Sequence, residues 1–158
     1  MKKIIRAGGI FYAIGLIGIA IQQFIYQAFR PVILPTWPFQ TPANGFWAIF
    51  IGLFLILAAI AIMFDWQAER ASLLLGGLLL IFFLVAQVPF EILYNPYNGH
   101  LGTWTDPIKE LALSGGALII AGSFRRENAN PGSVSKLMQL LRRVVPAGRI
   151  FFSVMLIL

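Results

Sequence analysis

The sequence predicts an all-α integral membrane protein: an antiparallel bundle of four transmembrane helices, followed by the start of a fifth helix. Hydrophobic residues make up 59% of the 158-residue chain and charged residues only 11%, a balance that a soluble domain cannot bury. Charge is absent from residues 7–29, 31–64 and 71–90, and each stretch reaches the roughly 20 residues that a helix needs to cross hydrocarbon. Basic residues lie between these stretches, as expected of a chain that crosses the membrane repeatedly.

The first predicted helix covers residues 7–29 and follows Lys2, Lys3 and Arg6. The same layout resembles the start of a secretory signal peptide. However, the apolar stretch is longer than a typical signal-peptide core, and Gly18-Ile19-Ala20 is a poor cleavage site. We therefore interpret this segment as an uncleaved transmembrane helix.

A proline-rich loop, residues 30–42, follows the first helix, because proline breaks helices and restricts the residue before it. Trp37 and Phe39 are its expected interfacial anchors. The next two helices are expected at residues 43–64 and 71–93, and the short link between them makes them antiparallel neighbours.

The fourth predicted helix, residues 108–124, follows a turn-rich aromatic loop at residues 94–107. Only residues 111–124 are free of charge, which is short of a full span. The helix crosses the membrane if Lys109 and Glu110 belong to it and snorkel outward.

The distribution of charge supports four spans. They place Arg30 and Lys109 on one side and the other ten lysines and arginines on the opposite side, which the positive-inside rule identifies as cytoplasmic. A re-entrant fourth segment would instead require translocation of the basic residues 125–149. The sequence therefore predicts an inner-membrane protein with a cytoplasmic amino terminus.

Residues 125–145 form a predicted basic cytoplasmic connector. Within it, Leu137, Leu140 and Leu141 share one face of an amphipathic stretch that is expected to lie along the inner leaflet. Within residues 146–158, residues 147–158 resemble residues 7–18 in spacing and character. This similarity predicts the truncated start of a second, parallel repeat in a protein of about twice four helices.

Composition also excludes several kinds of site. The chain has no cysteine and one histidine, so disulfides and thiol chemistry are excluded and no metal site is predicted. The net charge of +6 includes no basic stripe interleaved with stacking aromatics, so nucleic acid is not an expected partner. The expected partners are the lipid bilayer and other membrane subunits.

Polar residues near the external end of the predicted bundle form the candidate site, because such residues are costly near lipid. They are Gln23, Gln87, Glu91, Trp104 and Lys109. The functional interpretation is a proton-exchanging or quinone-headgroup site, in which Glu91 takes up or releases protons and Lys109 adjusts its proton affinity. The alternatives are interface charges that pair with one another, and glutamines that hydrogen-bond between helices.

Small residues inside the predicted helices have a simpler interpretation. Gly76-Gly77 and Ser114-Gly115-Gly116-Ala117 are expected to let neighbouring helices approach closely in lipid. His100, Asp106 and Glu110 join the charged residues of the external end.

Residues 19–26 (IAIQQFIY), 34–38 (LPTWP) and 46–48 (FWA) resemble the first two helices of DoxX-type membrane proteins, and residues 104–118 resemble the entry to that family's last helix. The resemblance covers residues 7–124 and implies a four-helix membrane unit. For a few members of the family it also implies a part in thiosulfate:quinone oxidoreductase or another membrane redox complex. Many relatives carry histidine where this chain has Gln23, so an acid–base role at that position is in doubt.

The predicted function is a non-enzymatic or accessory component of a membrane complex. One alternative is a redox subunit that binds quinone, with Tyr94, Gln87, Glu91 and Trp104 around the headgroup. The other is a small-solute or proton-coupled transporter, which the repeat permits.

Overall fold

The computed structural model describes residues 2–35, 43–96, 99–125 and 136–157, and the regular elements in these ranges are all helical. This confirms the all-α prediction for the described part of the chain. In order, the elements are α1 (Lys2–Tyr26), α2 (Ala43–Met63), α3 (Ala68–Phe82), the π-helical segment η1 (Phe83–Gln87), α4 (Val88–Leu93), the 3-10 turn η2 (Leu101–Trp104), α5 (Thr105–Arg125), α6 (Lys136–Val144), the 3-10 turn η3 (Val145–Ala147) and α7 (Gly148–Ile157). Trp37, Phe39 and residues 126–135 of the predicted connector lie outside the described residues.

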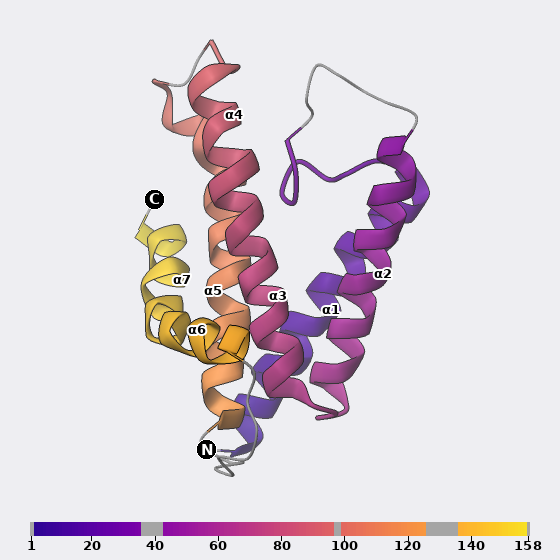
Figure 1. Cartoon of the computed structure of the whole chain (residues 1–158), viewed down its shortest axis with the longest axis vertical. Helices are drawn as coiled ribbons and strands as arrows, with labels where there is room; N and C mark the ends of the chain where they lie inside the picture. Colours follow the sequence, from indigo (N-terminus) through magenta and orange to yellow (C-terminus); the bar gives the residue numbers. More distant parts are fainter. Residues whose placement is uncertain (1, 36–42, 97–98, 126–135, 158) are drawn as a thin grey trace.

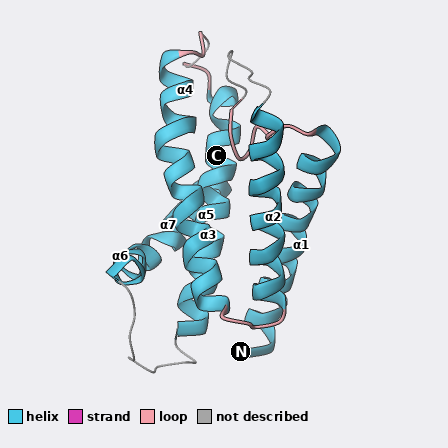
Figure 2. Ribbon diagram, turned by 45° about the vertical axis from the view of Figure 1, so that its right-hand side comes forward, coloured by secondary structure: helices cyan, strands magenta, loops and turns pink. Residues whose placement is uncertain are grey.

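The long helices run along a common direction (Figure 1). An antiparallel pair, α1 and α2, lies beside a second antiparallel pair formed by α5 and the continuous helix α3–η1–α4. The helix α7 packs on α5, while α6 lies across the bundle axis (Figure 2). The amino terminus, the α2–α3 turn and the end of α5 share one end, which we call the N-terminal end.

Three of the described helices are long and apolar enough to cross a membrane. They are Ile5–Tyr26, Gly45–Met63 and Ala68–Leu93, with mean hydropathy of 1.7, 2.8 and 2.4. Their outer faces also carry large exposed apolar side chains, as expected of helices that contact lipid: Phe11, Ile25, Phe46, Leu57, Val85 and Leu93. The chain is therefore a membrane protein.

Several helix boundaries differ from the expected ones for local backbone reasons. The helix α1 ends at Tyr26, before residue 29, where Gln27 adopts a left-handed φ of 47°. The helix α3 begins at Ala68, before residue 71, directly after left-handed Gln67. Left-handed residues cannot continue a right-handed helix. The helix α5 begins at Thr105, so it includes Lys109 and Glu110.

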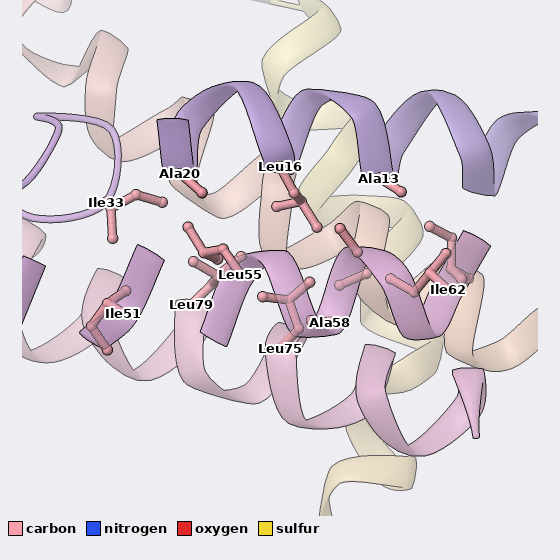
Figure 3. Close-up of a cluster of buried hydrophobic side chains, with 13 residues drawn as sticks. Ala13, Leu16, Ala20, Ile33, Ile51, Leu55, Ala58, Ile62, Leu75 and Leu79 are labelled. Carbon is pink, nitrogen blue, oxygen red and sulfur yellow. The ribbon is translucent and has the colours of Figure 1, made fainter. Parts of the chain in front are cut away.

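The main hydrophobic core lies where α1, α2 and α3 meet (Figure 3). Ala13, Leu16 and Ala20 repeat at helical spacing on α1 and are fully buried. They face buried Leu55 of α2 and Leu79 of α3 (Figure 3). Because two of the three α1 residues are alanines, the helices can approach closely.

Glycines set the spacing of α5 against its neighbours, which confirms the packing prediction for these residues. A Cβ atom added at Gly76 would lie 3.0 Å from the Leu118 side chain, and one at Gly116 would lie 2.9 Å from the Tyr12 ring. A hydrogen bond reinforces the contact between α1 and α5. The Tyr12 hydroxyl donates to the Leu113 carbonyl at 2.6 Å, so α1 and α5 are joined by a hydrogen bond.

The π-helical turn η1 lies inside the third long helix, just before Pro89. Proline lacks an amide donor and its ring crowds the carbonyl four residues earlier, here Val85. A wider π turn accommodates this defect without ending the helix. One consequence is that buried Gln87 lies on the irregular turn.

The amphipathic helix α6 packs against α3 through part of its predicted apolar face. The Leu141 side chain lies so close to Gly77 that a Cβ atom added there would be 2.7 Å from it, whereas Leu140 is 59% exposed. The predicted position of this apolar face along the inner leaflet stays a prediction. Arg142 Nε and Nη2 contact Glu69 Oε1 at 2.9 and 2.7 Å, which fixes α6 to the start of α3.

We expect Arg142→Ala and Glu69→Ala each to loosen α6, and the double variant to cost little more than either single one. The expected coupling is about 1 kcal/mol, since the pair is largely but not fully buried. A double-mutant cycle on amide hydrogen exchange within α6 measures it. Arg143→Ala, at an exposed neighbouring arginine, is the control; a coupling near zero would contradict the anchoring role.

Candidate functional site

Two of the predicted site residues, Gln87 and Glu91, lie one turn apart on the third long helix and are both buried. Gln87 Nε2 donates to the Pro31 carbonyl at 2.6 Å. Asn95 Nδ2 donates to Glu91 Oε2 at 2.7 Å. Both side chains thus have protein partners in nearby loops, a structural role that differs from the paired charges and the helix-to-helix bonds weighed as the alternatives.

Gln23 presents the opposite situation. It continues the core-facing stripe of α1 and is fully buried, and in the described part of the chain neither its Oε1 nor its Nε2 has a hydrogen-bond partner. Its neighbour across the helix pair is glycine, since a Cβ added at Gly52 would lie 3.1 Å from Gln23 Oε1. Gln22, the adjacent residue, is exposed. An unsatisfied amide inside a membrane bundle is costly, so Gln23 requires an explanation.

Lys109 lies outside the bundle core. Its ammonium contacts Asp106 Oδ1 at 3.1 Å, and the two side chains are 42% and 40% exposed. This is the ordinary pairing of interface charges weighed as the alternative to a functional role. Trp104 ends the turn η2 immediately before α5 and is partly buried.

Glu110 departs most from expectation. The sequence predicts that it snorkels outward with Lys109, but its side chain is fully buried and neither carboxylate oxygen has a hydrogen-bond partner among the described residues. Consecutive residues of a helix point about 100° apart, and here Lys109 lies on the partly exposed side of α5 while Glu110 lies on the side that faces the bundle. The sequence carried a usable signal, since Glu110 precedes Ser114 and Ala117 at helical spacing, and both are buried.

In its described part, the bundle contains two kinds of polar side chain: those with hydrogen-bond partners in loops and those inside the core without partners. Gln87 and Glu91 hold loops, while Gln23 and Glu110 interrupt the apolar stripes of α1 and α5 without partners. Amides and carboxyls donate and accept hydrogen bonds and carboxyls exchange protons. Within the described ranges, no group of three or more histidine, cysteine or acidic residues is placed to hold a metal ion.

No family model, curated protein or solved structure matches the chain. The DoxX resemblance and what it implies therefore stay predictions.

Proposed function

We propose that the chain is a four-span inner-membrane protein of DoxX type, with a cytoplasmic amino terminus, that serves as a non-enzymatic accessory component of a membrane complex. The finding that carries the fourth span is the burial of Glu110. The charges at the start of α5 made this span doubtful. With Glu110 inside the bundle and Lys109 paired with Asp106, α5 presents little isolated charge to lipid.

The dimensions of α5 support the same proposal. Its 21 residues make a helix of about 31 Å, enough to cross a hydrocarbon core of about 30 Å. It packs along α3 and against Tyr12 of α1, as a member of the bundle and not as a surface helix. Its basic end then joins the other basic residues in the cytoplasm.

A topology experiment tests the four-span proposal. Reporters fused after residue 66 and after residue 125 should both be cytoplasmic, and one fused after residue 95 should be periplasmic. Three spans would instead place residues 95 and 125 on the same side, because α5 would not cross. A periplasmic reporter after residue 125 would therefore overturn the proposal.

The accessory role rests on the kind of polar groups inside the bundle. Gln23, Gln87 and Glu91 are suited to holding a neutral ligand or a neighbouring segment, and two of them already hold loops. A catalytic site needs an activated nucleophile or a poised acid–base pair, which these three residues do not supply.

The second candidate, a subunit that binds quinone, is favoured by the unpartnered amide of Gln23. A quinone carbonyl would accept from Nε2, and the reduced hydroxyl would donate to Oε1. Either bond would remove the desolvation cost of a buried amide. In this candidate the ligand's isoprenoid tail lies among lipid chains and its headgroup between helices.

A further inference from the structure

The hydrogen bond between α3 and α5 sets the depth of Glu110. The Ser114 hydroxyl donates to the Gly76 carbonyl at 2.8 Å, which fixes the register of the two antiparallel helices. Glu110 precedes Ser114 by about one turn, so it lies opposite roughly residue 80 of the third long helix. That helix spans Ala68–Leu93, so Glu110 lies opposite the middle of the third long helix, in the second turn of α5, which begins at Thr105.

The direction of the side chain follows from its neighbours on α5. Leu113 accepts the Tyr12 hydrogen bond from α1, and Ser114 contacts α3. Glu110 lies three residues before Leu113 and four before Ser114, so it shares the face between them. The Glu110 side chain therefore points toward the region where α1, α3 and α5 meet. The buried face of α1 that ends in Gln23 lines the same core.

No charged side chain is shown to compensate Glu110. On its own helix, Asp106 and Lys109 pair with each other. On the helices packed against α5, Tyr12 is the ionisable group shown to touch the Glu110 face of α5. Its hydroxyl donates a hydrogen bond to the Leu113 carbonyl. The other described ionisable groups of those helices are near helix ends and form no hydrogen bond to Glu110: Arg6, Tyr26, Glu69, Arg70, Glu91 and Arg149.

An ionised carboxylate without a partner is among the costliest groups to bury, and more so inside a membrane protein, where water is scarce. A neutral carboxylic acid costs far less. We propose that Glu110 is a proton-binding site inside the bundle, a carboxyl that carries its proton at neutral pH and exchanges it reversibly. The inference rests on the proposed crossing of the membrane by α5, and its ligand is the proton itself.

Infrared spectroscopy of the protein in proteoliposomes tests this proposal. At neutral pH we expect the C=O band of a protonated carboxylic acid, shifted in D₂O, lost as the pH is raised and restored as it is lowered. The band should be absent from Glu110→Gln and present in Asp106→Asn and Glu91→Gln. A wild-type protein without the band at neutral pH, or a band that Glu110→Gln leaves unchanged, would overturn the proposal.

If the Glu110→Gln variant does not insert into the membrane, chemical labelling of carboxyls in the wild-type protein tests the proposal instead. Dicyclohexylcarbodiimide enters lipid and reacts with protonated carboxyls: the acid proton moves to a carbodiimide nitrogen while the carboxyl oxygen bonds the central carbon, and no group leaves. Mass spectrometry should find the adduct on Glu110 and not on Asp106. The topology reporters read whether α5 crosses the membrane and the infrared band reads the proton, so failure of one is distinguishable from failure of the other.

Discussion

Replacing Gly115 with leucine should detach α7 from α5 and raise the amide exchange rates of α7 by about 30-fold, equivalent to about 2 kcal/mol. A Cβ atom at Gly115 would lie 2.6 Å from the Gly148 carbonyl oxygen and 2.8 Å from the Phe152 amide nitrogen. Both atoms belong to backbone and cannot swing aside as a flexible side chain would. The helices must therefore separate.

Gly15→Leu is the matched control. Gly15 lies on an exposed face of α1, and a Cβ atom there would meet nothing within 4 Å. We expect α7 exchange to stay at the wild-type rate in this variant, measured by mass spectrometry in the same detergent. Equal protection of α7 in Gly115→Leu and wild type would show that the α5–α7 contact does not hold α7 in place.

The parts of this fold that the sequence predicted well are those governed by composition and spacing. Long uncharged stretches specify apolar helices wherever they fold, and Gly76 and Gly116 could be assigned to helix packing because glycine has little other use in a membrane helix. Boundaries were less predictable. The left-handed residues Gln27 and Gln67 are ordinary glutamines in the sequence, and nothing in their identity marks them as helix ends.

The candidate site was harder to predict, because function depends on which face each polar residue occupies. The sequence identified Glu91 and Lys109 by their charge, yet these side chains have nearby partners, Asn95 and Asp106. Glu110 is expected outside because it is charged and adjacent to Lys109. Its helical spacing to Ser114 and Ala117 instead places it on the buried face of α5.

Gln23→Met should stabilise the protein, by about 1 kcal/mol in free energy of unfolding. Methionine keeps the unbranched shape that the close approach of Gly52 requires and removes two buried polar atoms that have no partner. An SDS titration in mixed micelles measures the change. Gln22→Met, at an exposed neighbouring position, should change stability by less than about 0.5 kcal/mol.

The same variants separate a structural glutamine from a ligand-binding one. If the bundle binds quinone through this amide, decylubiquinone should raise the unfolding midpoint of the wild type and of Gln22→Met, but not that of Gln23→Met. A gain in stability together with a loss of ligand response would mean that the amide is kept for binding at the expense of the fold. A loss of stability in Gln23→Met would instead mean that its amide hydrogen-bonds within the membrane, and the quinone candidate would lose the observation that favours it.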